Sequence, residues 1–81
     1  MDRIISKFRK NSIEEIQVRL REYEGRHLID LRTFVGPRGQ ETLPTKKGIS
    51  IPIELFPNLK EAIQQVEEAL DEDDLARRRR R

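Results

Sequence analysis

The sequence predicts an α+β fold, in which a curved antiparallel sheet of four strands is followed by one C-terminal helix (ββββα). Two patterns lead to this prediction. Between residues 15 and 52, runs of apolar and polar side chains alternate with a period of two, which is typical of half-buried strands. From about residue 53 onward, apolar side chains recur at spacings of three and four, which indicates a helix with one apolar face.

The first two predicted strands show the clearest alternation. The first begins at about Glu15 and alternates three apolar with three polar side chains: Ile16, Val18 and Leu20 with Gln17, Arg19 and Arg21. A turn at Gly25 leads into the second strand, residues 27–35. On this second strand one face is expected to carry His27, Ile29, Leu31 and Val35, and the other Leu28, Asp30, Arg32 and Phe34.

Turn residues mark the remaining strands. Residues 36–39, "GPRG", form a turn because Pro fixes φ and Gly permits positive φ. A weak third strand is expected at Gln40–Leu43 and a fourth in "KKGISIP", which Pro52 ends or holds at a sheet edge. Residues 1–13 mix apolar and basic side chains, and we expect them to form either a short amphipathic helix or a mobile basic arm.

The predicted helix runs from Ile53 or Glu54 to about Glu72, and Pro57 is tolerated in its first turn. Its apolar residues form a narrow seam of the kind that paired helices use: Phe56, Leu59, Ile63, Val66 and Leu70. A chain of 81 residues with 35% hydrophobic residues has a thin core. We therefore expect a homodimer, in which this seam both covers the sheet and forms the dimer interface.

The net charge of +2 conceals a strong segregation of charge along the chain. Residues 1–52 carry +4, residues 53–76 carry −7, and the arginines at 77–81 carry +5. A basic front half favours a polyanionic partner. Three interpretations of the arginine tail are open: added phosphate affinity, a clasp that folds back on Asp71–Asp74, or a nuclear address.

Composition argues against several function classes. The chain has no Cys and one His. No stretch approaches the ~18 apolar residues of a membrane span, and the apolar run at the start of the sequence is too short for a signal peptide. We expect a soluble intracellular protein, cytoplasmic or in the nucleoid, or alternatively nuclear. Nucleophile, phosphate-loop and metal-binding motifs are missing, and the carboxylate pairs Glu14–Glu15 and Glu67–Glu68 are expected to be solvated. We therefore predict neither an enzyme nor a bound metal or cofactor.

Basic side chains gather on the predicted sheet. Alternation and short turns bring six of them toward one side of it: Arg19, Arg21, Arg26, Arg32, Lys46 and Lys47. Such a surface follows a nucleic-acid backbone, and Tyr23 and Phe34 are candidates to stack on exposed bases. Gly48 lets backbone or nucleic acid approach closely. The alternative is that these charges only solubilise an open sheet face and that Phe34 covers the core.

Two segments of the chain resemble a known family. "HLIDLRTFV", a Gly/Pro turn and then "PTKKGISIPIELFPNLKEAI" are similar to the single-stranded-DNA-binding domain of the transcriptional coactivator family called positive cofactor four, over roughly Ile16–Leu70. The resemblance implies a homodimer of ββββα chains whose helices pack across the interface. It also implies basic channels that hold two antiparallel single strands or the splayed strands of melted duplex.

The resemblance assigns roles to particular residues. It places Lys47 at the family's most telling lysine, with Lys46 just ahead of it, and Arg32 at an arginine that faces the nucleic acid. Tyr23 falls on an aromatic residue that stacks on bases, and Arg26 on a basic residue just past the turn glycine.

The chain departs from the family pattern at two positions. Val35 stands where some members carry a stacking tryptophan, and Glu24 stands where a basic residue is often found. The Ser- and Lys-rich region that precedes the domain in the nuclear coactivators is missing. The chain therefore resembles the compact form of the domain, as in bacterial or phage relatives.

We expect a basic arm at residues 1–13, a nucleic-acid-binding domain at 14–72 and an acidic, Arg-rich tail at 73–81. The expected function is sequence-independent binding of single-stranded DNA by a homodimer, in transcription regulation, replication or repair and in contact with that machinery. Two alternatives remain: an RNA-binding regulator that uses the same surface, and a dimeric protein-interaction module that does not bind nucleic acid.

Overall fold

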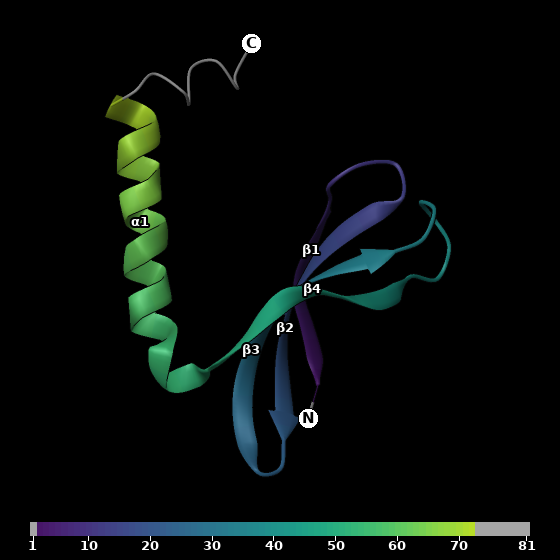
Figure 1. Ribbon diagram of the computed structural model, residues 1–81, viewed down its shortest axis with the longest axis horizontal. Helices are drawn as coiled ribbons and strands as arrows, with labels where there is room; N and C mark the ends of the chain where they lie inside the picture. The colour runs from purple at the N-terminus through teal and green to yellow at the C-terminus, as the bar shows by residue number, and fades with distance from the viewer. Residues whose placement is uncertain (1, 73–81) are drawn as a thin grey trace.

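The computed structural model of the protein describes residues 2–72. Within this range it has four strands and one α-helix, which confirms the predicted ββββα order (Figure 1). The elements are β1 (Arg3–Arg9), β2 (Glu14–Tyr23), β3 (Arg26–Val35), β4 (Leu43–Pro52), the 3-10 turn η1 (Ile53–Leu55) and α1 (Phe56–Glu72). The strands form one antiparallel sheet in the order β1-β2-β3-β4. The tail predicted at 73–81, and with it the proposed clasp, lies outside the described residues.

The N-terminal strand corrects one prediction. Residues 3–9 are neither a helix nor a free arm, because they pair with β2 from Arg3↔Leu20 to Arg9↔Glu15. One register shift, next to Ile4, interrupts this pairing. Without β1, one edge of β2 would present a row of unpaired backbone N–H and C=O groups, and β1 satisfies them.

The weak strand predicted at Gln40–Leu43 is also wrong. Residues 36–42 connect β3 to β4, and β4 is a single strand of ten residues that ends, as predicted, at Pro52. A Cβ at Gly36 would lie 2.7 Å from the carbonyl oxygen of Glu41. The connection therefore folds back tightly on its own start, which it can do only because residue 36 is Gly.

β2 and β3 form the regular centre of the sheet. They pair without interruption over all ten residues of each strand. The two-residue turn between them has positive φ at both positions, 51° at Glu24 and 77° at Gly25. This conformation matches the type I′ turn that tight hairpins favour. The resulting register decides which side chains of the two strands share a face.

The alternation gives the sheet one polar and one apolar face. The polar face carries the odd-numbered side chains of β2 and the even-numbered side chains of β3, because these residues are cross-strand partners. The apolar face carries Ile16, Val18, Leu20, Ile29, Leu31, Ile49 and Ile51. Among the apolar side chains of residues 2–72, only Ile29 and Phe34 are buried. The core of a single chain is therefore thin.

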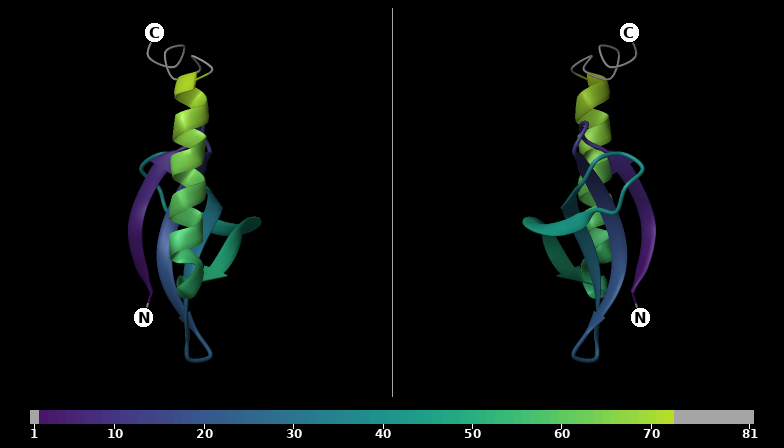
Figure 2. Two further views of the ribbon diagram at one scale, coloured as in Figure 1. Left: turned by 90° about the vertical axis from the view of Figure 1, so that its left-hand side faces the viewer. Right: turned by 90° about the vertical axis from the view of Figure 1, so that its right-hand side faces the viewer.

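α1 leaves the apolar face of its own sheet largely uncovered. The helix stands beside the sheet in Figure 1, and Figure 2 shows it from two further sides. None of the residues in η1 and α1 is buried, and Ile63 and Val66 are 58% and 56% exposed. The prediction that the seam covers its own sheet is therefore wrong, because η1 turns the chain away from the sheet after Pro52. Only Phe56, at the start of the helix, lies near the apolar face of the sheet.

Gly48 lets β4 cross close to β3. It pairs with Arg32, immediately before a register shift between Arg32 and Phe34. A Cβ at position 48 would collide with the carbonyl oxygen of Leu31 and would lie 2.8 Å from the Cα of Arg32. Both neighbours are backbone atoms that cannot swing aside, so only Gly fits at this crossing.

We expect Gly48→Ala to destabilise the fold by about 3 kcal/mol, because the added methyl group forces the two strands apart. Gly39→Ala is the matched control. A Cβ at Gly39 meets no atom within 4 Å and only its φ of 81° is unfavourable, so the expected cost is about 1 kcal/mol. Urea unfolding at one fixed protein concentration measures both variants, and equal losses would contradict the close crossing.

Candidate nucleic-acid interface

The polar face carries a line of basic and aromatic side chains. Arg19, Arg21 and Tyr23 follow one another along β2, and Arg26 and Arg32 project to the same side from β3. This common side follows from the pairing of the two strands and from the alternation of side chains along each. The structure thus places four of the six basic residues predicted to share one side of the sheet on the same face as Tyr23: Arg19, Arg21, Arg26 and Arg32.

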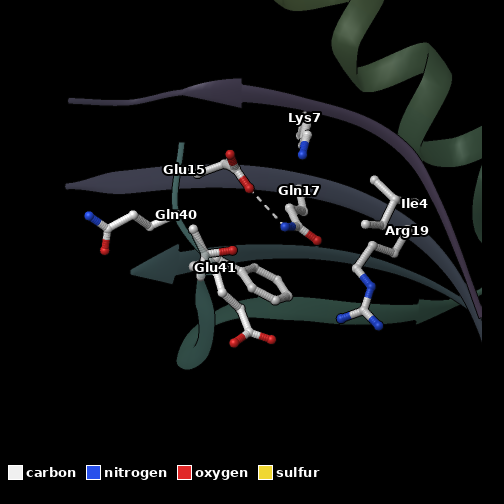
Figure 3. Close-up of a pocket in the computed structure, with 9 residues that line it drawn as sticks. Ile4, Lys7, Glu15, Gln17, Arg19, Gln40 and Glu41 are labelled. Atoms are coloured by element: carbon white, nitrogen blue, oxygen red, sulfur yellow. Dashed lines mark hydrogen bonds between the residues drawn. The ribbon is translucent and has the colours of Figure 1, made fainter. Parts of the chain in front are cut away.

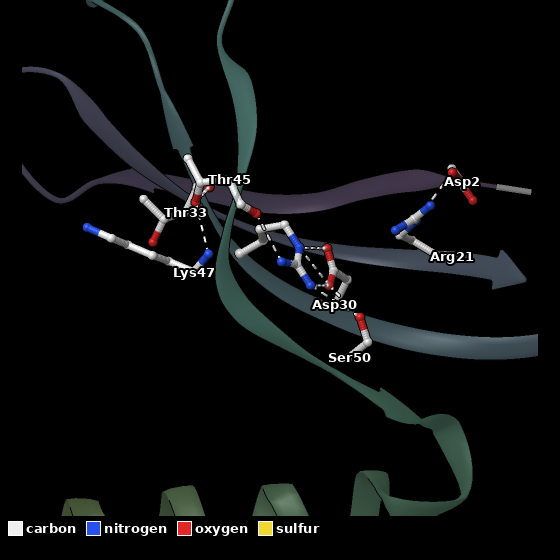
Figure 4. Close-up of polar contacts among 8 residues, drawn as sticks. Asp2, Arg21, Asp30, Thr33, Thr45, Lys47 and Ser50 are labelled. Carbon is white, nitrogen blue, oxygen red and sulfur yellow. Dashed lines mark hydrogen bonds and ion pairs between the residues drawn. The ribbon is translucent and has the colours of Figure 1, made fainter.

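A buried carboxylate lies in the middle of this line. Asp30 is fully buried, at 0% exposed, and it accepts hydrogen bonds from Arg32 Nη2 at 2.9 Å and from Arg32 Nε at 3.1 Å. The hydroxyl of Ser50 on β4 donates to the same carboxylate at 2.7 Å (Figure 4). Burial alone would raise the pKa of Asp30, but the hydrogen bonds from Arg32 and Ser50 and the charge of Arg32 outweigh it and lower the pKa.

Arg32 connects this carboxylate to the start of β4. Its Nη1 donates to the carbonyl oxygen of Thr45 at 3.0 Å. The hydroxyl of Thr45 donates to the carbonyl oxygen of Thr33 at 2.7 Å and accepts from the backbone N–H of Lys47 at 3.1 Å (Figure 4). Through Arg32 and Thr45, hydrogen bonds therefore connect Asp30 to the backbone N–H of Lys47.

Asp2 lies against the two arginines of β2. Its Oδ2 is 3.5 Å from Arg21 Nε and 3.9 Å from Arg19 Nη2, and its other oxygen accepts from the backbone N–H of Glu22 at 3.2 Å. The hydrogen bond from Glu22 is the main reason that the pKa of Asp2 is lowered, and the charges of Arg21 and Arg19 act in the same direction. The Nε atoms of both arginines are buried and make no hydrogen bond, so the Nη groups are the donors that face outward from this pair of side chains.

The side chain of Lys47 lies apart from the arginine side chains. Lys47 Nζ is 3.7 Å from the carboxylate of Glu14, and its side chain extends away from Asp30 in Figure 4. Glu14 lies one residue before Glu15 on β2 and so points to the opposite face from the arginines. The Nζ of Lys10 is 3.8 Å from the same carboxylate. A hydrogen bond from Asn11, followed by the charges of Lys10 and Lys47, lowers the pKa of Glu14.

The two predicted stacking residues differ sharply in exposure. Tyr23 is 60% exposed at the tip of the β2–β3 hairpin. Phe34 is only 6% exposed, and the guanidinium of Arg19 lies over its ring at 5.4 Å from the centroid. Tyr23 is therefore free to stack on a base in this structure, whereas Phe34 is covered.

The carboxylate partners of the basic residues are what sequence reasoning missed. The spacing of Asp30 and Arg32, two residues apart on one strand face, is a signal that identifies this pair. Asp2 and Glu14 carry no comparable signal, because their contacts depend on the pairing of β1 and on the path of β4.

The described part of the chain has neither a metal site nor a membrane-spanning helix. Residues 2–72 contain no group of His, Cys, Asp and Glu side chains arranged to hold a metal ion. Their one α-helix is not long and apolar enough to cross a membrane.

Comparison with known proteins identifies the family. The model of the family described as "Transcriptional Coactivator p15 (PC4)" matches residues 10–62. The chain belongs to this family. A relative from Drosophila melanogaster, an RNA polymerase II transcriptional coactivator, is 40% identical over 55 residues, which are 68% of this chain and 49% of that protein. The chain thus spans about half the length of this relative. The PC4 family, to which the chain belongs, is non-enzymatic.

Solved structures of PC4 homologues have the same fold. One from Burkholderia pseudomallei is 29% identical in its orthorhombic crystal form, with a TM-score of 0.73 over 80% of this chain and 88% of that chain. Its tetragonal form is 28% identical, with a TM-score of 0.72 over 83% and 98% of the two chains. A bacteriophage T5 homologue of PC4, implicated in recombination-dependent DNA replication, is 24% identical, with a TM-score of 0.62 over 91% and 80%, and supports the fold alone.

The buried pair of Asp30 and Arg32 predicts a pH-dependent stability. A carboxyl group whose pKa is lowered by folding stabilises the protein above its unfolded pKa of about 3.9, and this contribution is lost as the pH falls through the folded pKa. We expect Asp30→Asn to cost about 3 kcal/mol at neutral pH, and the difference from the unmodified protein to shrink below about pH 4.

Urea unfolding at neutral pH and at several acidic pH values measures this effect. Asp71→Asn is a matched control, since Asp71 is exposed in α1 and its removal is expected to leave the pH dependence unchanged. Parallel stability curves for Asp30→Asn and the unmodified protein would show that Asp30 does not carry the effect.

Proposed function

We propose that the protein is a homodimer that binds single-stranded DNA inside the cell, in transcription regulation, replication or repair. The observation that carries the proposal is the line of Arg19, Arg21, Arg26, Arg32 and Tyr23 along one face of the β2–β3 hairpin. Guanidinium groups bind phosphates, and an exposed aromatic ring stacks on any base. Contacts of this kind carry little base information. Membership of the PC4 family, with its transcriptional coactivators, supports a role in transcription.

The carboxylates that hold these cations differ in how easily a phosphate replaces them. Asp2 is 44% exposed beside Arg19 and Arg21, and exposed ion pairs contribute only ~0–1 kcal/mol. A phosphate therefore displaces Asp2 at little cost. Asp30 is buried and keeps its bonds to Arg32, so Arg32 mainly positions β3 against β4 and offers few unused donors to a phosphate.

Lys46 and Lys47 add phosphate contacts from β4 in this proposal. Lys46 is exposed, and Lys47 is 73% exposed where it meets Glu14. This ion pair is weak enough to be exchanged for a phosphate. Because the lysine side chains are long and exposed, they reach a strand that passes over the edge of β4 without any change in the backbone.

The homodimer rests on two apolar surfaces that one chain leaves exposed. The first is the apolar face of the sheet, where Val18, Leu20, Ile29 and Phe56 help to line an open cavity of about 390 Å³. The second is the seam of α1: Phe56, Leu59, Ile63, Val66 and Leu70. Burial of apolar surface contributes ~25 cal/mol per Å², which offsets the thin core of a short chain. A second copy of the same chain supplies apolar surface for both.

We expect fluorescence anisotropy to show tighter binding to single-stranded DNA than to duplex of the same length. If the five cations other than Arg32 engage phosphates, log K falls with log[salt] at a slope of about −3.5, because each contact on a single strand contributes about −0.7. A slope shallower than about −1 would contradict the phosphate contacts. Preference for matched RNA would favour an RNA-binding regulator, and binding to no nucleic acid would leave a protein-interaction module.

Lys47→Ala is expected to weaken binding to all single-stranded sequences alike and to reduce the salt slope by about 0.7. The control is Lys60→Ala, which removes the same charge from an exposed position on α1. Salt titrations of the two variants separate a local phosphate contact from an effect of net charge. Indistinguishable titrations would show that Lys47 makes no contact of its own.

Ile63→Asp is expected to convert the dimer to a monomer, because it places a charge in the centre of the seam, where desolvation is costly. Gln64→Asp introduces the same side chain on the neighbouring, polar side of α1 and is expected to remain dimeric. Analytical ultracentrifugation of both variants measures the association. A dimeric Ile63→Asp would place the interface elsewhere.

A further inference from the structure

A pocket of about 310 Å³ opens on the polar face beside Phe34 (Figure 3). Three strands and one loop line it: Ile4 and Lys7 from β1, Glu15, Gln17 and Arg19 from β2, Phe34 from β3, and Gln40, Glu41 and Thr42 from the loop before β4. This volume is at the lower end of the ~300–1,000 Å³ found for pockets that hold small organic groups. The line of arginines described above does not explain it.

Two buried polar side chains form the inner wall of this pocket. Gln17 is 5% exposed and Glu15 is 9% exposed, so the prediction that Glu15 is solvated is wrong. The amide Nε2 of Gln17 donates to Glu15 Oε2 at 2.8 Å, as the dashed line in Figure 3 marks. This bond turns the amide nitrogen of Gln17 toward Glu15, and the second oxygen of Glu15 accepts none of the hydrogen bonds found among the described residues.

The pocket therefore presents acceptors at its inner wall, and the cations Lys7 and Arg19 and the carboxylate of Glu41 line it as well. An ionised carboxylate only accepts hydrogen bonds, and it repels a phosphate. Lys7 and Arg19 lie on either side of Gln17 and supply positive charge to the phosphate backbone of a bound DNA strand. The side of the Phe34 ring supplies an apolar surface. Such a site suits a base that turns its hydrogen-bonding edge inward while its phosphates remain outside.

The geometry points to a base-binding pocket that prefers guanine, with Glu15 as the residue that reads the base. Guanine is the base whose Watson–Crick edge carries two adjacent donors, N1–H and N2–H, which match the two oxygens of one carboxylate. Its O6 acceptor lies beside them, where Lys7 or Arg19 supplies a donor. Adenine and cytosine place a ring-nitrogen acceptor next to their single amino group, and thymine places one N–H between two carbonyl oxygens, so each brings an acceptor against Glu15.

This inference rests on the proposed function and adds a modest base preference to backbone binding. The test compares strands of repeated dT-dT-dT-dG with strands in which inosine replaces every dG, and with dT alone. Inosine lacks only the N2 amino group of guanine. We expect the dG strand to bind at least about tenfold more tightly than the inosine strand, because the inosine strand loses a hydrogen bond to a charged acceptor.

Glu15→Gln is the matching variant. It is expected to abolish the difference between dG and inosine, while binding to dT stays equal or becomes tighter, because the variant no longer places a negative charge near the phosphates. Glu54→Gln removes the same charge from η1, outside the residues that line this pocket, and is expected to keep the guanine preference. Binding of Glu15→Gln to dT also verifies that this variant folds.

Each outcome has a separate meaning. Equal binding of dG and inosine strands by the unmodified protein would overturn the guanine pocket and leave single-strand binding intact. A full preference retained by Glu15→Gln would overturn the assignment to Glu15. Failure to bind any of the three strands would overturn the proposed function together with the pocket.

Discussion

The buried carboxylate of Asp30 is the interaction on which the arrangement of the sheet depends. A charge buried in this way costs several kcal/mol unless it is paired and hydrogen-bonded. Its partners are Arg32 on the same strand and Ser50 on β4. A slip of β4 by one residue would turn Ser50 to the other face and leave the carboxylate short of a donor. Asp30 thus favours one register of β4, and Gly48 permits the close crossing that this register needs.

The same physics divides the other ion pairs of the protein into fixed and exchangeable ones. Arg32 is held by a fully buried partner, so its guanidinium is part of the fold. Asp2 and Glu14 hold Arg19, Arg21 and Lys47 at the surface, where water and salt screen the pairs. Carboxylates in these positions keep the cations in place without strongly competing with phosphates. A basic surface that also carries acidic side chains is therefore compatible with nucleic-acid binding.

Local patterns predicted the features that depend on local geometry. The period of two assigned Arg19, Arg32 and Phe34 to one face correctly, because alternation follows from the strand itself. The burial of Glu15 was not predictable, since it depends on the pairing of β1 and on a loop that folds back at Gly36. The direction of Lys47 depends on the register shift near Gly48. These features arise from contacts between segments far apart in the sequence, which no short-range pattern encodes.

β4 contributes side chains to both faces of the sheet. Ser50 bonds to Asp30 on the polar face, while Ile49 and Ile51, its immediate neighbours, lie on the apolar face. The same strand then continues through η1 into α1, which carries the exposed seam. A change confined to the exposed part of α1 leaves β4 in place, because Asp30 and Gly48 fix its register. Any effect of a contact at α1 on the polar face must therefore pass through a displacement of β4, and the bonds of Ser50 and Thr45 oppose that displacement.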